Sequence, residues 1–286
     1  KVLADMELTG IKCDKNILES QGAEVKQRID KLDKLIQEQC GEEFNVASPR
    51  QLGVVLFEHL NLPFAKKIKS GYKTDQETLR KLVDYHPAIK NIIEYRNITK
   101  LYNTYLDGLV PYIKKDGKIH TTYKQNMTRT GRLSSAEPNM QNIPARDMEG
   151  KKIKKAFFPS NDILMSCDYS QIELRLLAHI SGSKELQSAF INGEDIHTKV
   201  AADIHNIPQS EVTKEMRSTA KAVIFGIVYG ISGFGLGENL NIKPSEAKKF
   251  IDKYYELYPG VKRYMDSIIK EAKNQGYQFK LLDEFK

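Results

Sequence analysis

The stretch that decides the fold is MSCDYSQIELR, residues 165–175. The apolar run at 163–165 leads to Asp168, and the residues after Gln171 have the spacing of a helix. This pattern predicts a short buried strand, at 162–168, that ends at the aspartate. A carboxylate at the end of a buried strand costs free energy unless something pairs with it. Asp168 is therefore expected to bind a partner, and Glu173 is the nearest carboxylate in the helical part.

Composition limits the class of protein. A chain of 286 residues that is 40% hydrophobic can bury a core large enough for two domains or one elaborate domain. Its apolar runs are far shorter than the roughly 20 residues of a membrane span, and residues 1–10 lack the apolar region of a signal peptide. A protein with no membrane partner is therefore expected.

Cysteine spacing and charge narrow the class further. Cys13, Cys40 and Cys167 are far apart and form no paired motif, so neither a disulfide framework nor a zinc site is expected. This favours a reducing intracellular compartment. The net charge of +7, with 44 Lys and Arg residues, favours a polyanionic partner.

The first third of the chain has helical patterns. Apolar residues recur with helical period over 15–39, which predicts a long amphipathic helix. Ser48 before Pro49 predicts the start of a helix that continues to Leu60. Thr74 with Glu77 three residues later predicts a capping box, and a further helix is expected over 87–109.

The pattern changes after Pro111. The Asp-Gly pair at 116–117 precedes alternating residues and predicts a hairpin or edge strand. IKKAFFPS, residues 153–160, and DILMSCD, residues 162–168, are predicted as two further strands. Beyond Gln171 helices are predicted again, at 185–191, 196–205, 213–229, 245–257 and 261–274. Helices, then strands, then helices indicate an α+β fold with a small sheet and two helical regions.

One helix carries a ridge of functional side-chain types. In EMRSTAKAVIFGIVYG, residues 215–230, Arg217, Lys221, Phe225 and Tyr229 recur every fourth residue. At about 100° per residue, successive members rotate by only about 40° around the axis. Two cations followed by two aromatic rings suit phosphates at one end and a base or sugar at the other. The alternative is a half-buried helix whose basic start is solvated and whose aromatic end joins the core.

Three other segments have weaker signals. ISGFGLGEN, residues 231–239, lacks the third glycine of a dinucleotide-binding loop at its place and lacks a GK[ST] motif, so a flexible turn is predicted. His197 stands near Asp195 and could donate to an anion, although a lone histidine is more often structural. KKIKK, residues 151–155, is expected to be a solvated basic face.

TRTGRLSSAEPNMQNIPAR, residues 128–146, has the composition of a loop. It is either an ordinary polar surface loop or a segment that contacts phosphates and the acceptor-rich minor-groove edges of base pairs. Its candidate contact residues are Arg129, Arg132, Ser134, Ser135, Asn139, Gln141, Asn142 and Arg146.

Taken together, these motifs resemble the family A DNA polymerases. The matching segments are TRTGRLSS with PNMQNIPAR, then DYSQIELR, DIHTKVA and RSTAKAVIFGIVYG, in this order. The resemblance begins near Lys1, includes FNVASPRQLGVVLFEHLNLP, and extends to about Leu282. It implies a right-hand architecture, with a thumb-like helical region at 1–113, a partial palm with an antiparallel sheet at 114–171, and fingers with the start of a return to the palm at 172–286. It also implies a monomer that binds primer-template DNA and a deoxynucleoside triphosphate (dNTP).

The resemblance implies a metal site at Asp168. In this family the corresponding aspartate binds both catalytic Mg²⁺ ions, and the carbonyl of Tyr169 is a further ligand. A bound metal ion would offset the free-energy cost of burying the Asp168 carboxylate. Two-metal chemistry activates the primer 3′-hydroxyl and holds the triphosphate.

The resemblance also assigns the dNTP site. Five helical positions separate Glu173 from Asp168, about 140° around an axis, so the two would not share a face. The family uses this glutamate to crowd the sugar 2′ position and to hydrogen-bond Tyr229, which would also stack against the template side. Phe225 would pack on the sugar and base, where phenylalanine, having no hydroxyl, is expected to discriminate against dideoxynucleotides. The remaining implied dNTP ligands are Tyr169, Gln171, His197, Arg217 and Lys221, with Arg217 and Lys221 neutralising the triphosphate and His197 assisting at the β-phosphate.

The implied DNA contacts lie earlier in the chain. The loop residues would grip the primer terminus and test base-pair shape in the minor groove, while Lys100 would lie near duplex phosphates. The implied DNA-binding residues are Lys100, Arg132, Asn139, Gln141, Asn142 and Arg146.

The sequence departs from the family in one respect. The second metal-binding aspartate of the family lies in a His-Asp-Glu tripeptide, and the chain contains none. Asp283 and Glu284 occur too early to replace it. The chain is therefore expected to be an incomplete catalytic domain without nuclease domains. The alternatives are a non-catalytic remnant that binds primer-template DNA, and a single-subunit RNA polymerase or reverse transcriptase.

Overall fold

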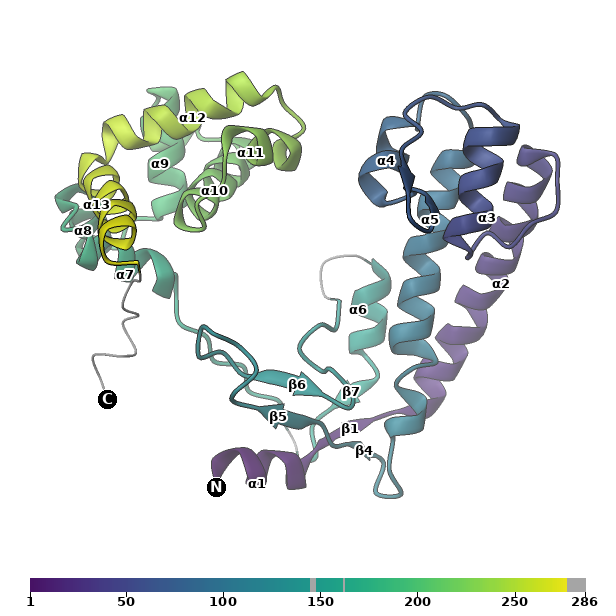
Figure 1. The fold of residues 1–286 in the computed structure, drawn as a ribbon. Coiled ribbons are helices and arrows are strands. Elements are labelled where there is room, and N and C mark those ends of the chain that lie inside the picture. The colour runs from purple at the N-terminus through teal and green to yellow at the C-terminus, as the bar shows by residue number, and fades with distance from the viewer. Residues whose placement is uncertain (145–147, 162, 277–286) are drawn as a thin grey trace. The chain divides into compact units, whose positions relative to one another are not determined.

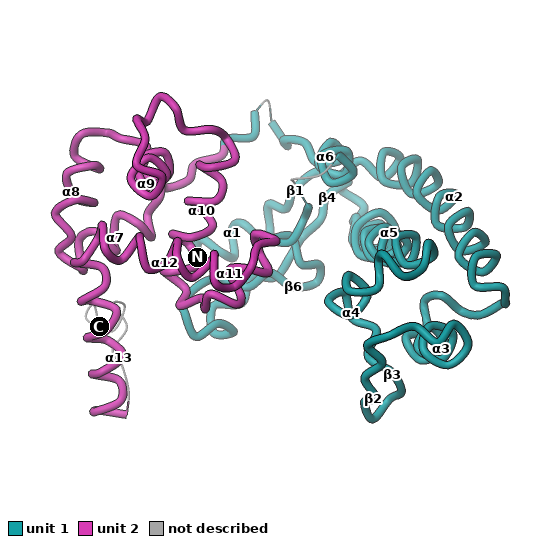
Figure 2. Tube along the Cα trace, turned by 90° about the horizontal axis from the view of Figure 1, so that it is seen from above, with its two compact units in different colours: residues 1–165 teal, residues 166–286 magenta. Residues whose placement is uncertain are grey.

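The computed structural model describes residues 1–144, 148–161 and 163–276. The chain divides into two compact units, residues 1–165 and 166–286, which Figure 2 distinguishes by colour. The fold is mostly helical, with small antiparallel sheets in the first unit. Within the described residues, no helix combines the length and apolar character needed to cross a membrane.

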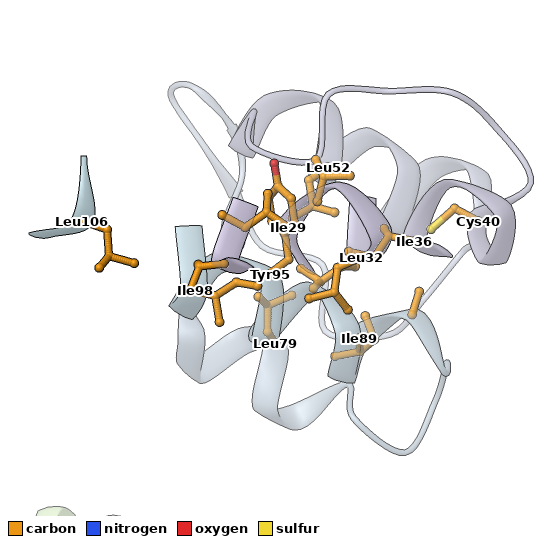
Figure 3. Close-up of a cluster of buried hydrophobic side chains, with 14 of the residues drawn as sticks. Ile29, Leu32, Ile36, Cys40, Leu52, Leu79, Ile89, Tyr95, Ile98 and Leu106 are labelled. Carbon is orange, nitrogen blue, oxygen red and sulfur yellow. The ribbon is translucent and has the colours of Figure 1, made fainter. Parts of the chain in front are cut away.

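Two long helices dominate the first unit. α2 (Lys15–Cys40) begins after Asp14, whose carboxylate accepts hydrogen bonds from the backbone N–H groups of Asn16 and Ile17. It packs against α5 (Ala88–Leu101). Their apolar stripes meet in the core shown in Figure 3, where Ile36 and Ile89 are fully buried. The amphipathic helix predicted over 15–39 is thus confirmed, since one stripe of α2 is buried and the opposite face is polar.

Two of the helical segments change their winding along the chain. Ser48 accepts a hydrogen bond from the Gln51 N–H and starts α3 (Pro49–Val54), which continues as the π-helical turn η1 (Val55–His59). Similarly, α5 runs into the π-helical turn η2 (Tyr102–Leu106), and the 3₁₀ turn η3 (Val110–Tyr112) follows. Both predicted helices are therefore present, with wider turns at their C-terminal ends.

The predicted capping box at Thr74 is wrong by one residue. α4 (Gln76–Lys81) is capped by Asp75, whose Oδ1 accepts hydrogen bonds from the backbone N–H of Thr78 at 3.1 Å and from its hydroxyl at 2.6 Å. Thr74 instead accepts hydrogen bonds from Arg96 through its carbonyl and its hydroxyl. The carboxylate competes successfully for the cap because it satisfies a free N–H at the helix start.

The central sheet has the order β4-β1-β7 and is antiparallel throughout. β1 (Ile11–Cys13), which follows α1 (Val2–Thr9), lies between β4 (Lys118–Ile119) and β7 (Phe157–Phe158). The sequence predicted a helical first third of the chain. Residues 11–13 instead form a strand that pairs with strands from the centre of the chain.

Two small hairpins complete the first unit. β2 (Lys67–Ile68) pairs with β3 (Gly71–Tyr72), and β5 (Thr122–Lys124) pairs with β6 (Ser134–Ala136). The predicted Asp-Gly turn is confirmed, because Gly117 has φ +73° and the chain reverses into β4. β6 lies inside the segment predicted as a loop.

Two predicted strands differ from the structure. In the segment 153–160, α6 (Met148–Lys154) ends before only Phe157–Phe158 form a strand. The strand predicted at 162–168 is wrong over 163–168, where the residues have no strand pairing and Met165 is 85% exposed. A strand is stable only beside a hydrogen-bonding neighbour, which an apolar run does not supply by itself. Asp168 is exposed, so the burial cost inferred for its carboxylate does not arise in this structure.

The second unit is helical in its described part (Figure 1). Its core contains Val200, Ile224 and the rings of Tyr254 and Tyr258, whose centroids lie 4.8 Å apart with the ring planes tilted by 31°. All five helices predicted beyond Gln171 are confirmed to within about two residues at each end. The helices are α7 (Ile172–Ile180), α8 (Lys184–Ile191), α9 (Ile196–His205), α10 (Lys214–Val228), α11 (Gly233–Leu240), α12 (Pro244–Leu257) and α13 (Pro259–Gln275), with the 3₁₀ turn η4 (Gln209–Glu211) after α9.

The turn predicted for the glycine-rich segment is wrong, because it forms α11. Ser232 caps this helix by accepting a hydrogen bond from the Gly235 N–H at 3.2 Å. The glycines allow close packing: a Cβ added at Gly233 would lie 3.2 Å from the Pro244 carbonyl oxygen in α12, and one added at Gly237 would lie 2.9 Å from the carbonyl oxygen of Ile242, just before α12. Tertiary contact thus outweighs the low helix propensity of glycine.

Candidate nucleotide-binding site and nucleic-acid interface

The predicted ridge lies on α10, facing away from the helix's buried side. Thr213 caps the helix by accepting a hydrogen bond from the Met216 N–H at 3.1 Å. Arg217 and Lys221 are exposed, whereas Val223, which lies about 160° around the helix from Lys221, is buried. The cations are therefore available to a ligand, as the ridge interpretation requires.

Arg217 is paired with Asp195 at the start of α9. Its Nε donates to Asp195 Oδ2 at 2.6 Å and its Nη2 donates to Oδ1 at 3.3 Å. The hydrogen bond from Arg217 lowers the pKa of Asp195 to about 2, and the same bond raises the pKa of Arg217. Both groups are therefore charged at neutral pH. Neither the motif nor the helical spacing revealed this pair, because its members belong to different helices.

His197 is buried beside the aromatic part of the ridge. Its side chain is 5% exposed, and its ring centroid lies 6.0 Å from that of Phe225. Burial lowers the pKa of His197, so the ring is neutral at pH 7. Its Nδ1 has no hydrogen-bond partner among the described residues. Lys221 Nζ lies 5.9 Å from the centroid of Phe225, whose ring is half-buried. The structure thus places His197, Phe225 and Lys221 in one group.

The end of α10 is tied to the start of α7. Tyr229, directly after the helix, donates a hydrogen bond from its phenol to Glu173 Oε1 at 2.8 Å. Gln171 precedes α7 in the left-handed conformation, with φ +54°, and its Oε1 is buried without a partner among the described residues. The hydrogen bond expected between Glu173 and Tyr229 is therefore present in the structure.

Asp168 and Tyr169 lie in the exposed segment that leads to α7. Among the described residues, no group of three or more His, Cys, Asp and Glu side chains could hold a metal ion. Mg²⁺ is commonly held by one or two carboxylates together with substrate phosphates, so it needs no cage made wholly of protein. An exposed carboxylate at Asp168 beside the carbonyl of Tyr169 fits such a partial ligand set.

The predicted DNA-binding residues lie in the first unit. Asn139, Gln141 and Asn142 belong to one exposed segment that is held by its own hydrogen bonds. Gln141 Oε1 accepts from the Ser135 N–H at 3.2 Å, the Gln141 N–H donates to Asn139 Oδ1 at 3.0 Å, and the Asn142 carbonyl accepts from the Tyr105 hydroxyl.

A buried network of hydrogen bonds holds the segment 139–142 against the rest of the first unit. The hydroxyls of Thr121 and Ser135 lie 2.6 Å apart, and Ser135 Oγ accepts from the Met140 N–H at 2.9 Å. Lys100 on α5 and Arg132 before β6 are exposed. Arg146 lies outside the described residues.

Comparison with known proteins identifies the family. The chain matches the family described as DNA polymerase family A over residues 15–284. It therefore belongs to DNA polymerase family A.

The relatives that it matches are bacterial DNA polymerases I. It is 53% identical over 279 residues to DNA polymerase I of Lactococcus lactis subsp. lactis, covering 97% of this chain and 32% of that protein. It is 50% identical over 279 residues to DNA polymerase I of Bacillus subtilis, covering 96% of this chain and 32% of that protein. The chain thus spans about a third of the length of these relatives.

A solved structure has the same fold. The POL domain of Pol1 from M. smegmatis, in complex with DNA primer-template and dNTP, matches with a TM-score of 0.88 and 39% identity. The match covers 98% of this chain and 50% of that one.

Proposed function

We propose that this chain is the part of a DNA polymerase I that binds primer-template DNA and the incoming dNTP for template-directed synthesis. The observation that carries the proposal is the α10 ridge, with exposed Arg217 and Lys221 at one end and Tyr229 hydrogen-bonded to Glu173 at the other. The structural neighbour, which is a complex with DNA primer-template and dNTP, supports the same assignment. In the reaction the primer 3′-oxygen would join the α-phosphorus and pyrophosphate would leave.

In this proposal the ridge binds the nucleotide in two parts. Arg217 and Lys221 neutralise the triphosphate, since charge-assisted hydrogen bonds to phosphate are strong. His197, being neutral, contributes a ring N–H as a hydrogen-bond donor and adds no charge. Phe225 packs on the sugar and base, while Gln171 and Tyr169 border the site.

The sugar would be selected at the Glu173–Tyr229 hydrogen bond. This bond holds the Glu173 carboxylate in place, so that a 2′-hydroxyl on the nucleotide would meet an occupied position. A site of this kind excludes ribonucleotides sterically and favours a DNA polymerase over an RNA polymerase.

Asp168 and the Tyr169 carbonyl would hold Mg²⁺ in this proposal. When bound there, Mg²⁺ supplies charge neutralisation for the phosphates and lowers the pKa of the attacking hydroxyl. The protein's own part is to present the carboxylate of Asp168 at the entrance of α7, in the same unit as Arg217 and Lys221.

The first unit would hold the DNA. We infer that the helices up to about residue 113 act as the thumb, that the central strands within 114–171 belong to the palm, and that the helices after Gln171 act as the fingers. The contacts with the duplex would come from Lys100, Arg132, Asn139, Gln141, Asn142 and Arg146. Exposed amide side chains suit the minor-groove acceptors that every base pair presents.

We further propose that the 286 residues alone bind these ligands weakly and extend a primer very slowly, because Asp168 is the one carboxylate among the described residues that we assign to the metal. A primer-extension assay with labelled primer-template, all four dNTPs and Mg²⁺ tests this, with DNA binding followed by fluorescence anisotropy. Robust extension would contradict the proposed incompleteness. Salt-dependent DNA binding without any extension would favour the non-catalytic alternative, and absence of both would refute the polymerase function.

A further inference from the structure

We propose that Asp195 is a positioning residue for nucleotide binding, which holds Arg217 by one edge of its guanidinium and leaves the other edge for phosphate. This inference rests on the proposed function of the α10 ridge. The two bonds from Nε and Nη2 occupy two of the five guanidinium N–H groups. The Arg217 side chain remains 45% exposed, so the remaining donors can reach a ligand.

The Asp195 carboxylate is itself held in place. Its Oδ1 accepts from the His197 N–H at 3.2 Å, and its Oδ2 accepts from the Thr198 hydroxyl at 2.7 Å. With the two bonds from Arg217, each carboxylate oxygen accepts two hydrogen bonds, which uses the roughly four acceptor positions of a carboxylate. Asp195 therefore joins the start of α9 to the first turn of α10, because its carboxylate is held at both of its oxygens.

Asp195 also holds the two helices that carry the proposed phosphate ligands in a fixed position relative to each other. Asp195 caps the helix that carries His197 and pairs with the helix that carries Lys221. Holding a flexible arginine in one orientation before the ligand arrives reduces the entropy lost on binding. For one immobilised long side chain this effect corresponds to a change in affinity of about 2- to 10-fold.

Two other roles would produce different results. As a helix cap only, Asp195 would be replaceable by asparagine or serine, which cap helices about equally well. As a carboxylate that merely competes with phosphate for Arg217, its removal would strengthen triphosphate binding. Positioning requires instead that losing the charged, two-point pair weakens binding while the fold is kept.

Isothermal titration of the full 286-residue chain with inorganic tripolyphosphate, and separately with dATP and Mg²⁺, separates these roles. The variants are Asp195→Asn and Asp195→Ser, with Glu194→Gln as the matched control. Glu194 is the adjacent carboxylate; it contacts Lys199 and Gln209, and its neutralisation makes the same change in net charge. We expect Asp195→Asn and Asp195→Ser to raise Kd about 2- to 10-fold and Glu194→Gln to leave it nearly unchanged.

A double variant assigns the effect to Arg217. In the Arg217→Gln background, Asp195→Asn should cause no further loss of affinity, because the group that it positions is gone. Unchanged or tighter binding by Asp195→Asn, or an equal loss in the Arg217→Gln background, overturns the positioning role. If wild type fails to bind tripolyphosphate, or Arg217→Gln binds it as tightly as wild type, the proposed function of the ridge falls and the positioning role falls with it.

A measurement without ligand distinguishes positioning from a general structural role. The Nε–H resonance of Arg217 should be slow to exchange with water in wild type and in Glu194→Gln, and fast in Asp195→Ser, while the thermal unfolding midpoints stay close together. Fast exchange in wild type would refute the positioning role whatever the binding data show.

Discussion

The phenol of Tyr229 donates a hydrogen bond of 2.8 Å to the carboxylate of Glu173, although 56 residues separate the two in the chain. The bond connects the end of α10 with the first turn of α7. It fixes a carboxylate at the place where the proposed nucleotide sugar would lie.

Replacing Glu173 by alanine should relax sugar selection. Removing the side chain opens space for a 2′-hydroxyl, so the preference for dATP over ATP should fall by about tenfold or more, which equals roughly 1.4 kcal/mol. Competition of the two nucleotides for this chain with primer-template, and incorporation by a longer polymerase that carries this segment, measure the effect. Tyr229→Phe, which removes only the hydroxyl, should show a smaller change in the same direction. A Glu173→Ala variant that rejects ATP as strongly as wild type would contradict the proposed role.

The cap of α4 can be tested by two substitutions. Asp75→Ala removes the acceptor of the Thr78 N–H and should lower the free energy of unfolding by about 1 kcal/mol. Glu77→Gln weakens an exposed pair with Lys81 and should cost less than about 0.5 kcal/mol. Urea unfolding of both variants gives the comparison. A larger loss from Glu77→Gln would restore the capping box expected from the sequence.

Two glycines should respond to alanine with opposite signs. Gly22 lies inside α2, and a Cβ there would meet the Tyr102 ring at an ordinary 3.6 Å, so Gly22→Ala should stabilise the protein by about 0.5–1 kcal/mol. Gly237→Ala would place a Cβ 2.9 Å from the Ile242 carbonyl oxygen and should destabilise it by about 1–3 kcal/mol. Thermal or urea unfolding checks both signs.

His120 should make the first unit less stable as the pH rises. Its Nδ1 lies 2.7 Å from the Glu7 carbonyl oxygen and its Nε2 lies 3.0 Å from Asp116 Oδ2, and only the protonated ring can donate to both. The backbone hydrogen bond to Glu7, followed by the bond to Asp116, raises the pKa of His120. The stabilisation is complete below the unfolded pKa of about 6.5 and is lost as the pH rises through the folded pKa. Unfolding measured from pH 6 to 8 should show this loss in wild type and much less of it in His120→Gln.

His197 should have the opposite effect in the second unit. Burial lowers its pKa, so below about pH 6.5 the unfolded chain takes up a proton that the folded chain resists. Stability should therefore fall as the pH falls from about 7 to 5. Amide hydrogen exchange in α9, compared between wild type and His197→Gln, measures the effect. If the free energy of opening of α9, obtained from the exchange rates, did not change between pH 7 and 5 in wild type, the ring of His197 would not be buried in solution.

Local patterns predicted most helices because their causes are local. The apolar stripe of α2, the Ser48 cap of α3 and the bounds of α9 can be read along the chain, since each depends on residues within about one turn or on a repeated period. The same reasoning failed for α11, where glycines indicate a turn locally but permit close packing against α12.

Strands were predicted less well because they depend on distant partners. The run at 163–165 has the composition of a strand, yet no described strand pairs with it. Conversely, the three residues of β1 are too few to show an alternation, although they form the centre of the sheet. Pairing is a property of two segments, and one segment's composition does not contain it.

By itself, the sequence determined the family, through the order and spacing of the motifs from Thr128 to Gly230, and the helices, through their apolar periods. Tertiary structure decided which polar groups meet: Glu173 with Tyr229, Arg217 with Asp195, and His197 with Phe225. Each of these contacts joins two helices, and the packing of their buried faces sets the distance between the side chains. Spacing along one helix determines on which face a side chain lies. The neighbouring helix supplies the partner, which shifts the pKa of that side chain and holds it in one orientation.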